Sequence, residues 1–388
     1  NETQKTALSH MASIRPYSAD KFMLIDSSSR RNLELVETLR EKQKRGSLLW
    51  VLDKTRTAMG ARTLRGYVEQ PLIDAAEIRE RLTAVEELTQ KPMLRDEIRE
   101  YLNPIYDLER LISRISYQSA NPRDMVAFAS SLAMIPFIRQ ILGEFKAPIL
   151  QKIYEDMDPL EDVTDLIRRA IVDEPPLAQK DGGIIREGYH ADVDKYRRSR
   201  TDGKKWLAEL EAREKERTGI KSLKIKYSRV FGYSLEVTNS FKDQVPDNYV
   251  RKQTLTNAER YITQELKELE DLILGAEDRL YALEYELFAD VRDKVGQEVL
   301  RIQKTAKAVA ALDVFASLAL VAEKNNFVRP KINETGVLDI KGGRHPVVEQ
   351  MIENDMFIPN DTYLDNQKKR VSIITGPNMA GKSTYMRQ

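Results

Sequence analysis

A stretch without proline, residues 257–326, places the strongest constraint on the fold of this chain. Apolar side chains recur there every seven residues, and a second apolar series fills the complementary positions: Leu266, Ile273, Leu280 and Leu287, with Leu269, Ala276 and Leu283. A heptad stripe of this kind predicts a long helix that packs against another helix as in a coiled coil. Unbroken, it would extend about 105 Å at about 1.5 Å per residue. Gly275 and Gly296 are the expected breaks.

A partner for this helix is predicted just before it. Residues 187–220 have the pattern of a long, charged helix, and residues 223–228 and 233–238 alternate apolar and polar side chains. Gly232 lies between the two alternating segments as the expected turn residue, which predicts a β-hairpin. We therefore expect two antiparallel helices that carry a small β-hairpin at their far end.

Shorter helices are expected over residues 23–177. Asp74 and Glu77 form a capping box ahead of an apolar helical repeat. Prolines punctuate further short helices at Pro92, Pro104, Pro122 and Pro136. Charged residues make up 32% of the chain and aromatic residues only 7%, a composition that favours long solvated helices over a sheet-rich fold.

Near the end of the sequence, residues 376–383 match the phosphate-binding pattern G-x-x-x-x-G-K-[ST]. Residues 371–375 before this loop predict a short buried strand, and residues 383–387 predict the start of a helix. A strand, a glycine-rich loop and a helix in that order form an anion-binding turn. Lys382 would reach the β- and γ-phosphates of ATP, and the Ser383 hydroxyl would ligate Mg²⁺.

An α/β domain is expected to begin after Pro330, because residues 337–340 predict a further short strand. The later strand and helix units that a P-loop sheet requires do not follow. The sequence also starts at Asn1 rather than Met. We therefore expect this chain to be a fragment that is cut at both ends.

Several classes of site are excluded by composition. The chain has no cysteine, which excludes disulfides, thiolate zinc sites and cysteine nucleophiles. Its three histidines, His10, His190 and His345, are far apart and lack metal-ligand spacing. We find no apolar run near 18 residues and no signal peptide, so we expect a cytoplasmic protein without a membrane partner.

Positive charge is concentrated in residues 195–229, where 13 Lys and Arg outnumber 5 Asp and Glu in a chain of net charge +1. This segment could contact DNA phosphates, or its charges could form i,i+4 pairs on a solvated helix face. Tyr227, Phe231 and Tyr233 could stack on bases, although aromatic residues of a hairpin more often form its core. The candidate DNA-contacting residues are Lys204, Lys205, Lys221, Lys224, Lys226 and Arg229.

Taken together, these residues resemble the MutS family of DNA mismatch-recognition ATPases. The resemblance covers essentially the whole chain and is far more specific than the P-loop alone. The stretches that carry it are GPNMAGKST at 376–384, GRHPVV at 343–348, FIPN at 357–360, VFGYSLEV at 230–237, RKQTLTNAERYITQE at 251–265 and LDKTRTAMGARTL at 52–64.

The resemblance implies a mainly α fold: a multi-helix core with long lever helices, a small β-hairpin clamp at their tip, and the truncated beginning of an α/β P-loop ATPase domain. It implies the following parts: a connector remnant at 1–16, helical core and lever at 17–183, the clamp at 184–274, lever and core again at 275–326, and the start of the ATPase domain at 327–388.

The resemblance also implies a nucleotide site. Phe357 would pack on the adenine with Ile358 beside it, and Lys382 and Ser383 would be the catalytic residues, Ser383 holding Mg²⁺. The remaining contacts to ATP or ADP would come from Gly376, Pro377, Asn378, Met379, Ala380, Gly381 and Thr384.

The intact protein would be a homodimeric ATPase that binds mismatched double-stranded DNA, acts as a sliding clamp and works with downstream repair factors. This sequence lacks the mismatch-wedge domain, the acidic Walker B segment and the signature loop of the family. The chain alone is therefore expected neither to discriminate mismatches nor to hydrolyse ATP.

Three other functions remain open from the sequence. A MutS-like paralogue acting in recombination would share the ATPase and core, although residues 230–237 and 257–261 resemble a true clamp. A chromosome-organising coiled-coil ATPase would need a longer heptad run and a P-loop near the N-terminus. A non-enzymatic helical module that clamps DNA is the third.

Overall fold

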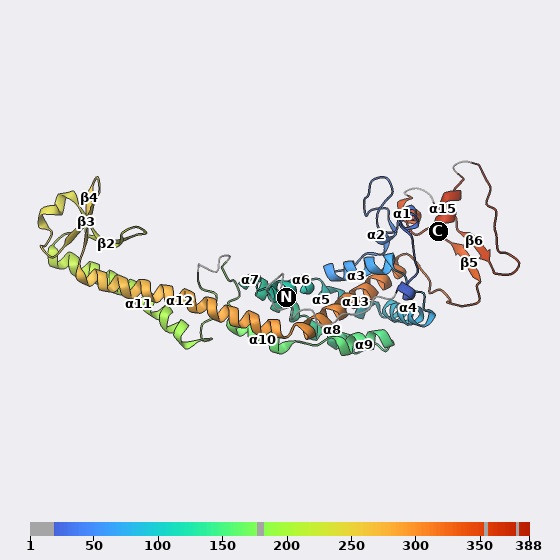
Figure 1. Cartoon of the computed structure of the whole chain (residues 1–388), viewed down its shortest axis with the longest axis horizontal. Helices are drawn as coiled ribbons and strands as arrows, with labels where there is room; N and C mark the ends of the chain where they lie inside the picture. The colour runs from blue at the N-terminus through green and yellow to red at the C-terminus, as the bar shows by residue number, and fades with distance from the viewer. Residues whose placement is uncertain (1–18, 177–181, 353–355, 378–379) are drawn as a thin grey trace, which may run out of the picture. The chain divides into compact units, whose positions relative to one another are not determined.

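The computed structural model describes residues 19–176, 182–352, 356–377 and 380–388. The chain is mainly helical, with one four-stranded and one two-stranded antiparallel sheet in the described residues (Figure 1). It divides into two compact units. The first unit comprises Asn1–Ser119, Ala127–Thr164 and Val295–Gln388, and the second comprises Ala120–Val126 and Asp165–Lys294. The expected connector remnant at 1–16 lies outside the described residues.

Short helices and one long apolar helix build the core of the first unit. Their bounds, with those of two helices that continue into the second unit (α7 and α10), are α1 Ser27–Asn32, α2 Leu48–Leu52, α3 Ala58–Glu69, α4 Ala75–Gln90, α5 Pro92–Leu102, α6 Leu108–Ser116, α7 Pro122–Leu132, α8 Ile135–Leu142, α9 Pro148–Asp156, α10 Glu161–Ala170 and α13 Val299–Lys324. The predicted capping residue Asp74 accepts a hydrogen bond from the Glu77 N–H at 2.8 Å. Pro92 and Pro122 begin helices, where their missing N–H is not needed.

Helix α13 is the centre of this unit. It packs against α3, α4, α5, α6 and α9, and most of its side chains are buried. Within the described residues, α13 and the stretch Pro122–Leu142 are long and apolar enough to cross a membrane. We expected no apolar stretch of that length. In α13, 72% of the most apolar window is buried inside the protein, as in the core helix of a soluble protein.

Asp313 is a buried carboxylate in the middle of α13. It accepts hydrogen bonds from the backbone N–H groups of Arg56 (2.9 Å) and Thr57 (2.7 Å) and from the Thr57 hydroxyl (2.7 Å). Burial raises the pKa of Asp313, although these hydrogen bonds oppose the effect. Gly60 packs directly on it, because a Cβ at this position would lie 2.3 Å from Asp313 Oδ2. The carboxylate thus positions the first turn of α3 on α13.

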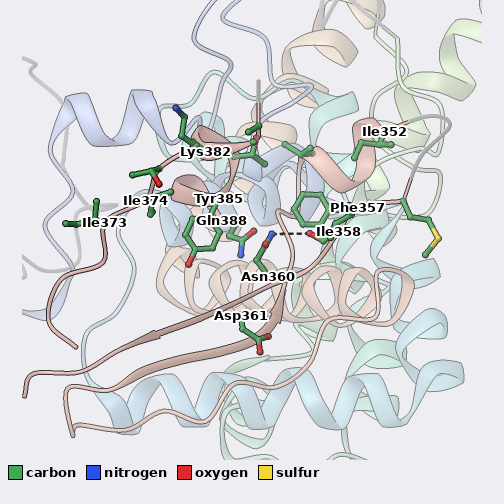
Figure 2. A pocket seen from close by; sticks show the side chains of 16 residues that line it. Ile352, Phe357, Ile358, Asn360, Asp361, Ile373, Ile374, Lys382, Tyr385 and Gln388 are labelled. Atoms are coloured by element: carbon green, nitrogen blue, oxygen red, sulfur yellow. Dashed lines mark hydrogen bonds between the residues drawn. The ribbon is translucent and has the colours of Figure 1, made fainter. Parts of the chain in front are cut away.

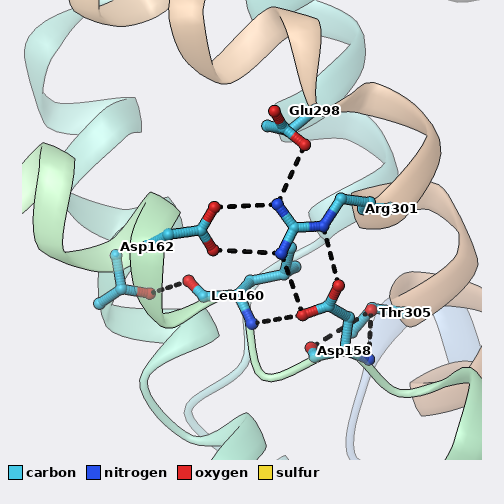
Figure 3. Close-up of polar contacts among 7 residues, drawn as sticks. Asp158, Leu160, Asp162, Glu298, Arg301 and Thr305 are labelled. Atoms are coloured by element: carbon cyan, nitrogen blue, oxygen red, sulfur yellow. Dashed lines mark hydrogen bonds and ion pairs between the residues drawn. The ribbon is translucent and has the colours of Figure 1, made fainter.

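Arg301, in the first turn of α13, holds three carboxylates (Figure 3). Its guanidinium nitrogens lie 2.8 Å from Asp158, 2.9 Å from Asp162 and 3.0 Å from Glu298. The hydrogen bonds to Asp162, Asp158 and Glu298 raise the pKa of Arg301. The contacts fix the loop before α10 to the beginning of α13.

The second unit consists largely of two long helices and a sheet. Helix α11 spans Ala191–Thr218 and α12 spans Gln264–Gln297, whose last residues belong to the first unit. The strands β1 Lys224–Ser228, β2 Gly232–Thr238, β3 Val250–Thr254 and β4 Ala258–Ile262 form an antiparallel sheet in the order β1-β2-β4-β3. Figure 1 shows this sheet at one end of the α11–α12 pair. Its core contains Leu207, Leu210, Ile220, Leu223, Leu235, Val237, Tyr249, Tyr261, Leu266 and Ile273.

Helices α11 and α12 run antiparallel. Arg197 near the start of α11 pairs with Glu284, and Arg213 near its end pairs with Glu265. Gly203 lies on α11 between these two ion pairs and allows α12 to approach closely, because a Cβ there would lie 2.6 Å from the Ile273 side chain. The heptad positions Leu266, Ile273 and Leu280 are buried, as the stripe predicted.

The proline-free stretch is not one helix. Residues 258–262 form β4, because they pair with β2 on one side and β3 on the other. Helix α12 ends at Gln297, directly after the predicted break at Gly296, whereas Gly275 lies inside the helix. The predicted two-stranded hairpin is therefore part of a four-stranded sheet, and β3 and β4 were missed.

The last part of the chain contains β5 Leu338–Gly343, α14 Val348–Met351, β6 Asn360–Leu364 and α15 Lys382–Arg387. The predicted strand at 371–375 is wrong, because these residues pair with no strand in the described chain. Val371 and Ile373 are 82% and 86% exposed. A strand needs a neighbour for its backbone hydrogen bonds, and among the described strands β5 and β6 pair only with each other.

Candidate nucleotide pocket and basic sheet surface

A pocket of about 830 Å³ lies between the loop before β6 and helix α15 (Figure 2). It brings Phe357 and Ile358 together with Ala380, Gly381 and Lys382, which are more than 20 residues later in the sequence. The pocket is also lined by Val348, Ile352, Met356, Asn360, Asp361, Ile373, Ile374, Thr375, Thr384, Tyr385 and Gln388. Phe357, Ile358, Lys382, Tyr385 and Gln388 are labelled in Figure 2.

The P-loop residues are only partly gathered in this pocket. Gly376, Pro377 and Ser383 do not line it, and the predicted contacts Asn378 and Met379 lie outside the described residues. The Lys382 ammonium donates to the Gly376 carbonyl oxygen at 2.7 Å. Helix α15 begins at Lys382, one residue earlier than predicted.

Gly381 is the residue that lets the chain turn into α15. Its φ is +80°, in the left-handed region that favours glycine, and nothing lies within 4 Å of where a Cβ would be. It precedes the first residue of the helix, so the backbone changes direction at this position.

Hydrogen bonds hold the two sides of the pocket in place. The hydroxyls of Thr362 on β6 and Tyr385 on α15 lie 2.8 Å apart. The Asn360 amide donates to the Ile358 carbonyl oxygen at 3.1 Å, as drawn in Figure 2. Asp361 accepts from the Gly342 N–H at 2.7 Å and so connects β6 to the end of β5.

The loop between β5 and α14 is anchored to the end of α13. Arg344 donates to the carbonyl oxygens of Asn325 (3.0 Å) and Asn326 (2.9 Å), and it pairs with Glu349 at 2.6 Å. His345 next to it accepts hydrogen bonds from the N–H groups of Val347, just before α14, and Val348, its first residue. Burial and, secondly, the nearby Arg387 lower the pKa of His345.

The six predicted DNA-contacting residues all lie in the second unit and are all exposed. In the described part of the chain, Lys205 lies 3.9 Å from Glu209, and Lys226 lies 2.6 Å from Glu236. No ion pair with a described residue is formed by Lys204, Lys221, Lys224 or Arg229. These four cations are available to a partner.

Several of the remaining positive charges of the segment form ion pairs within α11 or with the neighbouring helix α12. Lys215 pairs with Glu211 and Arg217 pairs with Glu214, both along the helix. Arg213 pairs with α12 through Glu265. The charge excess of residues 195–229 therefore overstates the positive potential that a ligand would meet. The sequence also allowed these charges to form ion pairs on a solvated helix face, and some of them do.

The polar face of the sheet carries a line of hydrogen-bonded side chains. Lys226 and Arg260 both contact Glu236, at 2.6 and 3.3 Å, and Arg260 also donates to Gln253 at 3.0 Å. The hydrogen bond from Lys226, followed by that from Arg260, lowers the pKa of Glu236. On the opposite face, Leu235 and Tyr261 are buried in the core of the unit.

The aromatic residues of the hairpin differ in their burial. Tyr233 packs against the core of the second unit. Tyr227 is 52% exposed and Phe231 is 42% exposed. The Tyr227 ring lies 5.0 Å from that of Tyr233, centroid to centroid, in a tilted arrangement. Tyr227 and Phe231 are therefore not core residues.

The sequence matches the family MutS domain III over residues 28–319, which is most of the chain. The chain belongs to the MutS family. It is 67% identical over 386 residues to the DNA mismatch repair protein MutS of Lachnoclostridium phytofermentans, and it covers 41% of that protein.

Other curated relatives give the same result. The DNA mismatch repair protein MutS of Acetivibrio thermocellus is 52% identical over 387 residues, and that of Clostridium beijerinckii is 48% identical over 388 residues. All of this chain is covered in each case, but only 44% and 42% of these relatives. The chain thus spans less than half the length of the MutS proteins that it matches.

Sequence reasoning missed several residues of this MutS-family pocket. Tyr385 lies one helical turn after Gly381, a spacing that could have indicated a position on the same side of α15. Val348 and Ile352 have the same i,i+4 relation beside the GRHPVV stretch. Gln388 had no sequence signal, because only the fold brings it against Gly343.

Proposed function

We propose that this chain is the core, the DNA-gripping clamp and the beginning of the ATPase domain of a DNA mismatch repair ATPase. The domain bounds follow the sequence-based expectation: 17–183 and 275–326 for core and lever, 184–274 for the clamp, and 327–388 for the start of the ATPase domain. The observation that carries the proposal is that Phe357 and Lys382 line one pocket. The name carried by the curated relatives supports it.

The residues of the pocket fit a nucleotide. Its volume of about 830 Å³ is in the usual range for small-molecule sites. Phe357 and Ile358 offer an apolar surface for a base, and Lys382 offers an ammonium group for phosphates. Both polar atoms of the Gln388 side-chain amide are buried without a partner in the described chain. A polar ligand in the pocket would satisfy them.

Bound ATP with Mg²⁺ would supply the phosphoanhydride bond that the intact protein hydrolyses. Lys382 would orient the β- and γ-phosphates once it leaves the Gly376 carbonyl, and Ser383 would hold the metal. Gly376, Pro377, Asn378, Met379, Ala380, Gly381 and Thr384 would provide the remaining contacts of the loop. The side chains that complete the ATPase site are expected in the part of MutS beyond this chain.

Arg344 is the residue through which we expect the pocket to act on the core. It fixes the loop before α14 to the last carbonyl groups of α13. A second contact joins the same region to α4, where Arg329 donates to the Thr83 hydroxyl at 3.1 Å. A change in the pocket can therefore shift α13, and a switch of this kind couples two sites in both directions.

The exposed cations of the second unit are proposed to grip duplex DNA through its backbone. Lys204, Lys221, Lys224 and Arg229 lack ion-pair partners among the described residues, and phosphates would neutralise them. We further propose that the intact protein is a homodimer in the bacterial cytoplasm, that it acts as a sliding clamp on mismatched DNA, and that it works with downstream repair factors.

The alternative functions are less well supported. The three relatives cited above are named as mismatch repair proteins, which favours this function over a recombination paralogue. A chromosome-organising coiled coil needs a far longer helix than α12, which has 34 residues. A non-enzymatic clamp leaves the nucleotide pocket without a role.

Nucleotide binding to the chain tests the pocket. We expect Lys382→Ala to weaken the affinity for a fluorescent ATP analogue about tenfold or more, because a charge-assisted contact is lost. Phe357→Ala should weaken ATP and ADP binding alike, because it removes the base contact. Lys368→Ala, an exposed lysine outside the pocket, is the matched control. Equal affinities for Lys382→Ala and Lys368→Ala, with unchanged circular dichroism, would overturn the assignment.

A further inference from the structure

A second pocket, of about 590 Å³, lies in the first unit and shares no lining residue with the nucleotide pocket. It is formed by the turn between α2 and α3, one face of α5 and the last turns of α13. Four of the nine lining residues are cationic. The lining consists of Asp53, Lys54, Thr55, Arg56, Asp96, Arg99, Glu100, Leu320 and Lys324.

Arg99 is the buried member of this lining. Only 5% of the residue is exposed. Its Nη2 donates to the Lys54 carbonyl oxygen at 2.7 Å, whereas its Nη1 is buried with no hydrogen-bond partner in the described chain. Burial and, secondly, the neighbouring Arg56 lower the pKa of the Arg99 guanidinium. A buried charged donor without an acceptor is costly, so this position favours an acceptor from outside.

The two buried carboxylates nearby already have other partners. Asp313 accepts from the backbone N–H groups of Arg56 and Thr57. Asp53 pairs with Lys44. Burial raises the pKa of Asp53, but the hydrogen bonds from Lys44 and Thr55 together outweigh burial, and the pKa is lowered. In the part of the chain that the structure describes, neither carboxylate forms an ion pair with the buried guanidinium.

The two exposed carboxylates at the rim are also engaged. Asp96 lies 3.0 Å from Arg95 Nε, and Glu100 lies 3.6 Å from Arg56 Nη2. Glu100 is 75% exposed at its side chain, so its pairing with Arg56 is weak and exchangeable. An incoming anion would compete with Glu100 for Arg56.

We propose that this pocket binds a phosphate-sized oxyanion. Arg99 lies at the buried side of the site, and Lys54, Arg56 and Lys324 lie at its exposed side. The backbone N–H of Lys54 is occupied by the Ser317 hydroxyl at 2.8 Å, and those of Arg56 and Thr57 by Asp313. The anion is therefore held by side chains. Phosphate, sulfate and carboxylate groups share the required chemistry.

Inorganic phosphate is the first probe. Its binding is measured by calorimetry or by ³¹P line broadening. The experiment uses the Lys382→Ala chain, so that the P-loop does not contribute. We expect saturable phosphate binding in this background and a loss of affinity of about tenfold when Arg99→Gln is added. Sulfate binding without acetate binding would identify a tetrahedral anion, and equal acetate binding would identify a carboxylate group.

A second variant, which we expect to bind phosphate more tightly, keeps the proposal testable if Arg99→Gln does not fold. Glu100→Gln frees Arg56 and should tighten phosphate binding several-fold. Glu97→Gln removes an exposed carboxylate from the same helix but outside the pocket and should leave the affinity unchanged. The proposal is overturned if no saturable binding is seen with Lys382→Ala, or if Glu100→Gln binds phosphate no more tightly than Glu97→Gln.

Discussion

At the scale of single residues, close packing around buried polar groups decides which side chains this fold tolerates. Asp313 is the clearest case, because its carboxylate stands between α13 and the first turn of α3. Gly60 is at that position because the oxygen leaves no room for a methyl group. The choice of glycine therefore reflects a contact with α13, since Gly60 is the third residue of α3 and glycine is otherwise unfavourable in a helix.

Two glycines of α3 allow a matched test. Gly60→Ala should lower the free energy of unfolding by about 1–3 kcal/mol, because the new Cβ meets Asp313. Gly66→Ala, in the same helix with nothing within 4 Å of the new Cβ, should raise it by about 0.5–1 kcal/mol through helix propensity. Urea denaturation of both variants measures the difference. A Gly60→Ala protein as stable as Gly66→Ala would show that the contact is not as described.

At the scale of elements, the four-stranded sheet depends on a charged network that periodicity does not reveal. Glu236 lies on β2 between Lys226 on β1 and Arg260 on β4. One carboxylate thus connects three strands. The network also pairs Lys226, one of the sequence-based DNA-contact candidates, with a carboxylate of the same sheet.

The stability of this sheet should depend on pH. The pKa of Glu236 is lowered from the ordinary value of 4.5, so the carboxylate contributes stability that is fully present above about pH 4.5. That contribution is lost as the pH falls through the lower, folded-state pKa. Amide hydrogen exchange in β1, β2 and β4 between pH 6 and pH 3 measures it. Glu236→Gln should be less stable at pH 6 and should lose less on acidification; parallel pH profiles would contradict the assignment.

At the scale of the whole molecule, the proposed nucleotide pocket and the proposed DNA-contacting cations fall in different compact units. The pocket around Lys382 is in the first unit, and Lys221 and Lys224, which form no ion pair with a described residue, are in the second. Helix α12 runs through both units as one element. We expect such a division if the proposed DNA contact is separate from the proposed ATP site.

Binding of duplex DNA to the chain should be weak and should fall steeply with salt, because it rests on phosphate contacts. The double variant Lys221→Glu with Lys224→Glu should weaken binding about equally for matched and mismatched duplexes. Lys307→Glu, an exposed lysine of the first unit, is the control. Fluorescence anisotropy at several salt concentrations measures these affinities. Binding that is insensitive to salt, or a loss confined to mismatched DNA, would contradict a backbone contact.

Sequence by itself determined the features that repeat locally. The heptad positions of α12, the cap at Asp74 and the glycine before α15 each depend on neighbours a few residues away, and the side-chain spacing records them directly. The family resemblance implied that Phe357 and the P-loop serve one site, and Phe357 lines the same pocket as Ala380, Gly381 and Lys382.

Only the tertiary structure decided the features that depend on distant partners. Residues 258–262 became a strand because β2 and β3 offer backbone hydrogen bonds, and residues 371–375 did not, because no described strand lies beside them. Lys226 pairs with Glu236 on the neighbouring strand, and helix packing gives Arg99 a buried nitrogen without a hydrogen-bond partner among the described residues. The physical reason is common to all four. Pairing and burial are properties of two segments at once, and a single segment of sequence does not record what it will meet.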